Sequence, residues 1–299
     1  MINNITTEEY LAPGHRACAG CGQALAVRYV MKAAGKNSIV ANATGCLEVF
    51  STPYPETSWK VPWVHGAFET AASVASGIDK ALEKLKKRKK INLLAMAGDG
   101  GTFDIGFQAL SGAAERGHKF TYVCFDNGAY MNTGIQRSGA TPKYASTTTS
   151  PAGKKVHGKV QFKKNMPLIM ASHGAYVATT SVAYPHDLIK KVKKSFEHKG
   201  VSYIQVFCPC IPGWGISSSM SIEVAKLAFK SKVTPLFEVE NGIVSITNRP
   251  SKEIPVEEYL KNQKRFKHLT PSEIEGVQKH VDTQWERLVD LEESRVRIS

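Results

Sequence analysis

The sequence predicts an α/β fold, an open and mostly parallel sheet with helices on both faces, followed by a C-terminal hairpin and helical extension. Short apolar runs of strand length alternate with longer segments whose apolar residues recur at helical spacing. Two runs, at 91–97 and 119–126, are continuously apolar, as expected for buried parallel strands. The alternation ends after about residue 215. We therefore expect one α/β domain over 1–215 and an extension over 216–299 that packs on the core or on a neighbouring chain.

The first half of the chain supplies the beginning of this alternation. Gly35 can end the first helix, and the long third segment is rich in small residues that suit close packing on a sheet. The predicted elements are a helix over 22–35, a strand over 38–43, a helix over 66–90, a strand over 91–97, a helix over 103–117 and a strand over 119–126.

The second half begins with a polar loop over about 127–166, rich in Gly and Thr. Pro185 favours a helix start, and Asn241-Gly242 between two apolar runs is a strong hairpin-turn signal. The predicted elements are a strand over 175–182, a helix over 185–200, a strand over 201–210, a hairpin over 235–250 and amphipathic helices over 255–269 and 270–295.

Composition limits the class of protein. The chain has 299 residues, of which 42% are hydrophobic. No apolar run approaches the ~20 residues of a membrane helix, so we expect no membrane association. The N-terminus MINNITTEEYLAPGHRA lacks a basic segment followed by an apolar one, so we expect no signal peptide and a cytoplasmic protein. In such a reducing compartment, closely spaced cysteines favour metal binding or catalysis over disulfides.

The net charge of +13 raises the question of nucleic-acid binding. Much of the excess lies in two lysine-rich runs, at 84–90 and 190–194, that look like helix ends or outer faces. No helix-turn-helix, finger or aromatic-basic platform accompanies the charge, so we expect no nucleic-acid partner. We therefore interpret the positive charge as favouring association with an acidic protein partner.

A glycine-rich turn follows the strand at 91–97. Gly98-Asp99-Gly100-Gly101 precedes a helix, and ligands of open α/β sheets bind at the carboxyl ends of strands. The glycines let the backbone approach a phosphate, and the helix start offers free N–H groups. Asp99 suits such a site if it holds Mg²⁺, which bridges carboxylate and phosphate oxygens.

The next strand ends in a second oxygen ligand. Asn127, in DNGAYMNTG, follows that strand and lies one strand-helix-strand crossover after Asp99. The two side chains should therefore be close together at one edge of the sheet. Gly-Asp-Gly-Gly alone could be a tight turn, but the combination at this spacing favours a metal–diphosphate site.

Six cysteines raise a second question, beginning with the C-x-x-C pair Cys18 and Cys21 in GHRACAGCG. Cys46 follows the first strand in NATGC, and Cys208 and Cys210 follow a late strand in CPCIPGW. The pair alone is compatible with zinc, a redox dithiol or iron–sulfur ligation. Zinc sites usually have two paired motifs, whereas four thiolates from distant segments suit a [4Fe–4S] cluster. Cys124 lies in an apolar strand and is expected to be a packing residue.

These motifs together resemble the β subunit of the multisubunit pyruvate:ferredoxin oxidoreductases, within the 2-oxoacid:ferredoxin oxidoreductase family. The resemblance covers about residues 10–240. It is carried, in order, by GHRACAGCG, NATGC, GDGGTFDIGFQALSGAAERG, DNGAYMNTGIQRSGATP and PCIPGW. It implies a thiamine diphosphate-binding fold, with this chain supplying the diphosphate-binding half.

The resemblance also implies roles for individual residues. Asp99 and Asn127 would ligate Mg²⁺ through side chains and Ala129 through its carbonyl oxygen, while Asn132 would face thiazolium and substrate as the catalytic residue. The remaining residues expected at the cofactor are Gly45, Cys46, His65, Gly98, Gly100, Gly101, Tyr130 and Met131. For His65, Tyr130 and Met131, a purely structural role is about equally compatible with the sequence.

For the cluster, the resemblance implies Cys18, Cys21, Cys46 and Cys210 as ligands, with Cys208 as a competitor for the fourth place. The implied reaction is oxidative decarboxylation of a 2-oxoacid, with acyl transfer to coenzyme A and electrons passing through the cluster to ferredoxin. Pyruvate is the expected substrate, while oxalate, branched-chain 2-oxoacids and 2-oxoglutarate stay open. One alternative is a non-redox thiamine decarboxylase or synthase, which the dispersed cysteines disfavour. A second is a zinc-bearing nucleic-acid module, which Gly-Asp-Gly-Gly together with Asn127 disfavours.

The resemblance implies partner chains as well. Thiamine enzymes need a carboxylate against the aminopyrimidine, and Glu48, Glu56 and Glu69 have no distinguishing context for that role. An alpha subunit with the pyrimidine-binding half would supply it, and gamma and delta-type subunits would carry further clusters. We therefore expect this chain to be catalytically incomplete alone.

Overall fold

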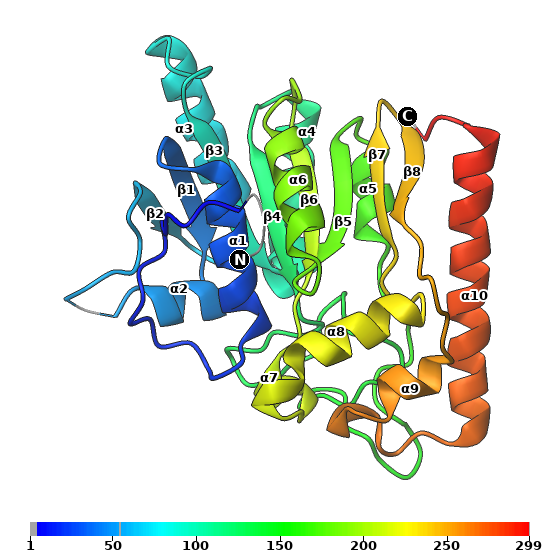
Figure 1. The fold of residues 1–299 in the computed structure, drawn as a ribbon. Helices are drawn as coiled ribbons and strands as arrows, with labels where there is room; N and C mark the ends of the chain where they lie inside the picture. Colours follow the sequence, from blue (N-terminus) through cyan, green and yellow to red (C-terminus); the bar gives the residue numbers. More distant parts are fainter. Residues whose placement is uncertain (1–4, 54, 299) are drawn as a thin grey trace.

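An eight-stranded sheet forms the centre of the computed structural model, which describes residues 5–53 and 55–298 (Figure 1). The strand order is β2-β1-β3-β4-β6-β5-β7-β8, and the six strands from β2 to β5 in this order run parallel. The strands are β1 (Ser38–Ala43), β2 (Trp63–Gly66), β3 (Asn92–Gly98), β4 (Thr121–Asp126), β5 (Tyr176–Ser181), β6 (Ser202–Phe207), β7 (Leu236–Glu240) and β8 (Ile243–Asn248). The expected mostly parallel sheet is confirmed.

Helices cover both faces of the sheet, as expected. The helices α1 (Gly22–Ala34) and α6 (Pro185–Ser195) pack on one face and on each other. The helices α3 (Ala71–Lys84), α4 (Phe107–Glu115) and α5 (Met166–Ala171) cover the other face. The strands between them are almost fully buried, which explains their continuous apolar sequences.

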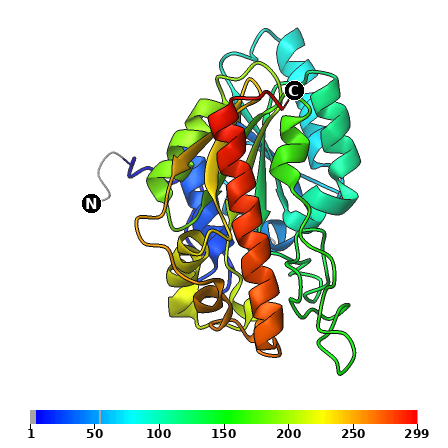
Figure 2. The same ribbon diagram turned by 90° about the vertical axis from the view of Figure 1, so that its right-hand side faces the viewer.

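The segment after residue 215 extends the same sheet (Figure 2). β7 pairs antiparallel with β5, and β7 and β8 form the expected hairpin, with φ of 52° at Asn241 and 78° at Gly242. The helices here are α8 (Ser221–Lys230), α9 (Val256–Leu260) and α10 (Pro271–Ser294). α10 begins with a capping box between Thr270 and Glu273 and runs beside the hairpin. The division into two units at residue 215 stays a prediction.

The expected helix over 66–90 is wrong in extent. Its first residue belongs to the edge strand β2, whose side chains are half-buried or exposed and therefore give no apolar run. Helix α3 starts only at Ala71, and the chain leaves it before Lys86, whose φ of 56° is left-handed. Lys84 is therefore the last residue of the helix, and the rest of the basic run lies beyond it.

The expected helix over 255–269 is also interrupted, between α9 and a 3₁₀ turn, η3 (Lys264–Phe266). Asn262 and Gln263 donate side-chain hydrogen bonds to the carbonyl oxygens of Glu258 and Tyr259, at 2.7 and 2.8 Å. Those carbonyls would accept backbone bonds in a continuing helix, so the side chains compete with it.

The helix expected over 103–117 begins with a π-helical turn, η1 (Gly101–Ile105), before α4. A side chain at Gly106 would lie 2.1 Å from the Gly101 carbonyl oxygen, so this turn requires glycine. Further elements were not expected: the helices α5 and α8, and the shorter α2 (Cys46–Ser51), α7 (Ile211–Trp214) and the 3₁₀ turn η2 (Ser218–Met220). Within the described residues, none of the helices is both long and apolar enough to cross a membrane.

Candidate active site

The carboxyl ends of β3 and β4 bring the two expected metal ligands together. The strands are parallel neighbours, with Gly98 opposite Phe125, so Asp99 and Asn127 follow adjacent strand ends. Asp99 is fully buried, and the backbone N–H of Asn127 donates to its Oδ1 at 3.2 Å. The proximity inferred from the crossover spacing is therefore observed.

Three oxygen-bearing groups converge at this point. One end of the Asn127 amide lies 3.0 Å from Asp99 Oδ1 and 2.9 Å from the carbonyl oxygen of Ala129. If that end is nitrogen, it donates to both groups; if it is oxygen, three acceptors meet without a donor. The second arrangement is the hard-oxygen donor set that suits Mg²⁺, so these residues fit the ion. Burial, and after it the charge of the neighbouring Asp126, raises the pKa of Asp99 to about 7.

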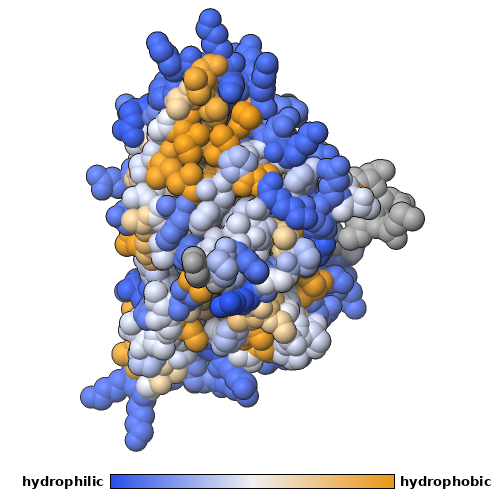
Figure 3. Space-filling model, turned by 90° about the vertical axis from the view of Figure 1, so that its left-hand side faces the viewer, coloured by the Kyte–Doolittle hydropathy of each residue, from blue (hydrophilic) through white to orange (hydrophobic). Residues whose placement is uncertain are grey.

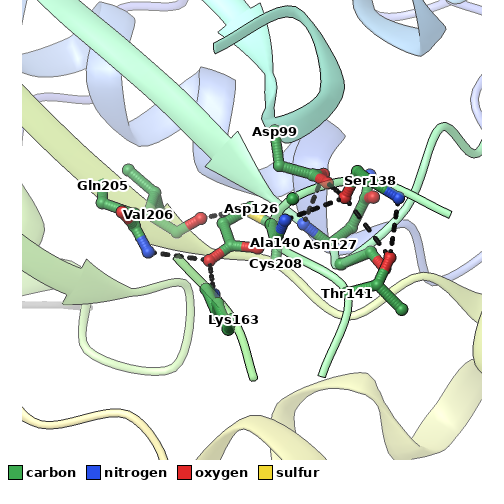
Figure 4. A network of polar contacts seen from close by, with 12 residues as sticks. Asp99, Asp126, Asn127, Ser138, Ala140, Thr141, Lys163, Gln205, Val206 and Cys208 are labelled. Atoms are coloured by element: carbon green, nitrogen blue, oxygen red, sulfur yellow. Dashed lines mark hydrogen bonds and ion pairs between the residues drawn. The ribbon is translucent and has the colours of Figure 1, made fainter. Parts of the chain in front are cut away.

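A polar network fastens the long loop over 127–166 to this corner (Figure 4). Ser138 donates from Oγ to Asp99 Oδ2 at 2.5 Å. On the neighbouring strand end, Asp126 Oδ2 pairs with Lys163 and accepts from Gln205 Nε2 at 2.8 Å. The two buried carboxylates therefore have separate partners, and only the Asp126 carboxylate has a cationic one.

A cavity of about 140 Å³ opens beside these ligands. It runs between the turn after β1, the end of β3 and the turn after β4. The expected cofactor residues that line it are Gly45, Cys46, Gly98, Gly100, Asn127, Ala129, Tyr130, Met131 and Asn132. Asn132 is exposed. Asp99 and Gly101 lie outside the lining set, as does His65, an exposed residue that hydrogen-bonds Thr44 at 2.7 Å.

The glycines of the Gly-Asp-Gly-Gly turn have different surroundings. A side chain at Gly98 would meet no atom within 4 Å, so the strand end leaves open room where a diphosphate would approach. A side chain at Gly100 would lie 2.4 Å from the Tyr130 ring. Tyr130 is held there by a hydrogen bond from its hydroxyl to Asp104 Oδ2, at 3.0 Å. The room at Gly98 and the glycine-dependent packing at Gly100 fit a diphosphate cradle.

The four cysteines expected as cluster ligands gather on the α1 side of this cavity. Cys21 is the N-cap of α1, Cys46 is the first residue of α2, and Cys210 is the N-cap of α7. Burial, followed by the charges of Cys210, Cys21 and Cys18, raises the pKa of Cys46 to about 12. The charges of the other three thiols therefore act on Cys46, but within 5–53 and 55–298 no group of three His, Cys, Asp or Glu side chains is placed so that it could hold a metal ion.

Backbone N–H groups lie near two of these sulfurs, those of Cys21 and Cys210. The N–H groups of Gln23 and Ala24 lower the pKa of Cys21, and that of Gly213 lowers the pKa of Cys210, although burial raises both overall. Amide donors of this kind stabilise thiolate ligands and tune iron–sulfur clusters. The donor chemistry fits a thiolate-bound cluster.

The other two cysteines are buried in the sheet region. Cys124 in β4 is fully buried, which confirms the expected packing role. Cys208 is also fully buried, and its thiol donates to the Val206 carbonyl at 3.3 Å. Cys210, in contrast, is only half-buried and neighbours Cys21 and Cys18. This contrast favours Cys210 over Cys208 as a ligand.

Sequence reasoning missed several residues of the site. Asp104 anchors Tyr130, and Asp126 adds a second buried carboxylate beside Asp99. Trp214 donates from its indole nitrogen to the Asn127 carbonyl at 2.7 Å, and the guanidinium of Arg265 lies over its ring at 4.1 Å. Trp214 could have been suspected from CPCIPGW, whereas nothing in the sequence around Arg265 indicates a role.

Comparison with known proteins agrees with this geometry. Residues 43–206 match the family described as thiamine pyrophosphate enzyme, C-terminal TPP binding domain. The chain is 56% identical over 289 residues to pyruvate synthase subunit PorB of Methanocaldococcus jannaschii, covering 94% of this chain and 97% of the relative. It is 46% identical to ketoisovalerate oxidoreductase subunit VorB of Pyrococcus furiosus, covering 97% and 95%.

Among solved structures, the fold resembles a chain of 2-oxoglutarate:ferredoxin oxidoreductase from Magnetococcus marinus, determined with 2-oxoglutarate, coenzyme A and succinyl-CoA bound. The TM-score is 0.60 at 21% identity, covering 95% of this chain and 93% of that one. This likeness shows that the two chains share a fold. Together with the identity to PorB over nearly the whole length, these matches mean that the chain belongs to the pyruvate synthase subunit PorB family, whose core is a TPP-binding domain of the thiamine pyrophosphate enzymes.

Proposed function

We propose that this chain is the thiamine diphosphate-binding subunit of a 2-oxoacid:ferredoxin oxidoreductase that converts pyruvate and coenzyme A to acetyl-CoA and CO₂. The observation that carries the proposal is the position of Cys46. This residue lines the cavity beside Gly98 and Asn127 and also has Cys18, Cys21 and Cys210 as neighbours. Cys46 therefore belongs both to the cofactor cavity and to the group of four cysteines. This arrangement favours a redox enzyme over a non-redox thiamine decarboxylase.

The chain's residues hold the cofactor. Asp99, Asn127 and the Ala129 carbonyl are the proposed Mg²⁺ ligands, and the open room at Gly98 admits the diphosphate. When bound, thiamine diphosphate supplies the electron sink for loss of CO₂ from the 2-oxoacid. Asn132 lines the cavity and is exposed, so it is the proposed residue that faces substrate.

We assign Cys18, Cys21, Cys46 and Cys210 as ligands of a [4Fe–4S] cluster that removes the electrons one at a time. All four are free thiols, and three of them occupy first or capping positions of helices. Thiolate ligands of this kind require a reducing compartment, which supports the cytoplasmic location expected from the sequence. From the cluster the electrons would pass to ferredoxin through gamma and delta-type subunits.

The cavity lacks a residue that the chemistry needs. No glutamate in the described chain lines it, so the carboxylate that activates the aminopyrimidine would come from an alpha subunit. A surface for such a partner is available where Figure 3 shows an apolar patch over the β2 and α3 side of the molecule. Val64, on the edge strand β2, is 43% exposed, and Leu85, just after α3, is 62% exposed. An unpaired strand edge can pair with another chain, and a contiguous exposed apolar patch often marks an interaction site.

The test is turnover of the assembled complex with a panel of 2-oxoacids. Ferredoxin reduction with coenzyme A should be fastest with pyruvate, compared with 2-oxoisovalerate, 2-oxoglutarate and oxalate. A preference for 2-oxoisovalerate would instead support the alternative raised by the similarity to VorB. The isolated chain should show no turnover with any of them, and turnover by it alone would contradict the need for a partner carboxylate.

A paired substitution tests the fourth cluster ligand. Cys210→Ser should lower iron content after anaerobic reconstitution, because its thiol neighbours Cys21 and Cys18. Cys208→Ser, two residues away, should leave iron content unchanged, because that thiol is buried and bonded to its own strand. The opposite pattern would transfer the assignment to Cys208.

A further inference from the structure

A buried cation of the C-terminal extension lies behind the cofactor site. Arg265 is 6% exposed and belongs to the 3₁₀ turn η3. Its guanidinium donates from Nε to Gln263 Oε1 at 2.9 Å and from Nη2 to Tyr259 Oη at 3.3 Å. Among the described residues no carboxylate lies within the 4.0 Å of an ion pair. A buried charge without a counter-charge is costly, so its retention calls for an explanation.

The surroundings of Arg265 connect it to both halves of the site. Its guanidinium lies 4.1 Å over the ring of Trp214, in the short helix α7 that Cys210 caps. Trp214 in turn donates to the Asn127 carbonyl at 2.7 Å. The guanidinium also lies close to the turn after β4: Nη1 of Arg265 would be 3.1 Å from a side chain placed at Gly128.

Other charges near the site have local partners. Asp126 interacts electrostatically with Arg265 but is already paired with Lys163 and Gln205. Lys264 and Lys267, on either side of Arg265, are exposed. Arg265 is therefore a fixed positive charge that faces the Cys210 side of the site without a carboxylate to neutralise it.

We propose that Arg265 is a positioning residue whose charge stabilises the reduced cluster bound through Cys210. The inference rests on the proposed function, because it requires that cluster. A thiolate-ligated cluster is anionic and gains one further negative charge on reduction, while no bond is formed or broken. A nearby fixed cation therefore favours the reduced state and raises the reduction potential. This gives the C-terminal extension a role in electron transfer from the 2-oxoacid.

The expected size follows from Coulomb's law. A unit charge acting over ~10 Å at an effective dielectric constant of ~20 changes an equilibrium by roughly tenfold. For a one-electron couple, a tenfold change corresponds to ~59 mV. Removal of the Arg265 charge should therefore lower the midpoint potential of the cluster by that order of magnitude.

The experiment measures this potential directly in the full-length chain reconstituted anaerobically with iron and sulfide. Dithionite titration, followed by electron paramagnetic resonance, gives the midpoint potential of wild type, Arg265→Gln, Arg265→Lys and Lys267→Gln. The midpoint potential of Arg265→Gln should be ~59 mV lower than that of wild type. The potentials of Arg265→Lys, which keeps the charge, and of Lys267→Gln, which removes an exposed charge two positions away, should stay near that of wild type.

The outcomes separate this inference from the proposed function. If wild type binds no reducible cluster, the proposed function itself fails. If wild type has the cluster but Arg265→Gln leaves its potential unchanged, the inference is overturned. It is also overturned if the potential of Arg265→Lys falls as far as that of Arg265→Gln, because the charge is then not the cause. A loss of thiamine diphosphate affinity in Arg265→Gln at unchanged potential would overturn it as well. Should Arg265→Gln fail to fold, Arg265→Met takes its place, because it keeps the aliphatic stem and removes the charge: its potential should be lower by the same ~59 mV, and an unchanged potential would overturn the inference.

Discussion

Replacement of Gly100 by alanine separates two roles within the Gly-Asp-Gly-Gly turn. Gly100 has φ −60° and ψ −44°, which alanine adopts without strain. Any destabilisation must therefore come from the added methyl group, which would lie 2.4 Å from the Tyr130 ring. Moving the ring would also break the 3.0 Å hydrogen bond from Tyr130 to Asp104.

The magnitude follows from these two contacts. Overpacking a well-packed site costs about 1–3 kcal/mol, and loss of a hydrogen bond to a charged group costs about 1.5–3 kcal/mol. Because partial relaxation relieves some of each, we expect Gly100→Ala to lower the free energy of unfolding by about 2–4 kcal/mol.

A double-mutant cycle in urea denaturation tests this explanation on the cofactor-free chain. In a Tyr130→Ala background the methyl group meets no ring, so Gly100→Ala should be neutral or stabilising by up to ~1 kcal/mol. If Gly100→Ala destabilises both backgrounds equally, the contact with Tyr130 is not the reason for this glycine.

Three further predictions concern the cofactor room, pH dependence and assembly. Gly98→Ala should weaken thiamine diphosphate binding in isothermal titration without lowering thermal stability, whereas Gly77→Ala, also in open space but within helix α3, should leave the affinity unchanged and raise thermal stability slightly; unchanged affinity at Gly98 would contradict the diphosphate cradle. Burial, followed by the charge of Arg137, lowers the pKa of Lys159 to about 8, so the folded chain favours the neutral amine. The free energy of unfolding of wild type, measured relative to that of Lys159→Met, should therefore rise by about 3 kcal/mol between pH 8 and pH 10.5. If the difference in denaturation midpoint between the two proteins stays constant across this window, the assignment is refuted. Val64→Asp on the edge strand should prevent co-purification of partner subunits, whereas Val160→Asp, at a valine that is 54% exposed against 43% for Val64, should not; retained assembly in Val64→Asp would exclude that face.

The sequence predicted the corner of the site well, because parallel topology and local motif agree there. Asp99 and Asn127 each follow a buried strand, and one crossover between parallel neighbours leaves their positions little freedom. The grouping of Cys18, Cys21, Cys46 and Cys210 required the family resemblance, since spacing along the chain cannot bring three distant segments together.

The parts that were missed depend on tertiary contacts. β2 is a half-exposed edge strand that pairs only with β1, so its sequence shows no buried run. The interruption after α9 depends on which carbonyls Asn262 and Gln263 reach. Arg265 lies among exposed lysines in the sequence and becomes notable only when its guanidinium packs on Trp214.

The central claim is that one residue, Cys46, joins the thiamine cavity to an iron–sulfur cluster. Its most direct test is the iron, sulfide and thiamine diphosphate content of the anaerobically reconstituted full-length chain, in wild type and in Cys46→Ser. We predict about four iron atoms per wild-type chain, and a Cys46→Ser chain that loses most of its iron but still binds thiamine diphosphate. Zinc in place of iron, or full iron retention in Cys46→Ser, would contradict the account.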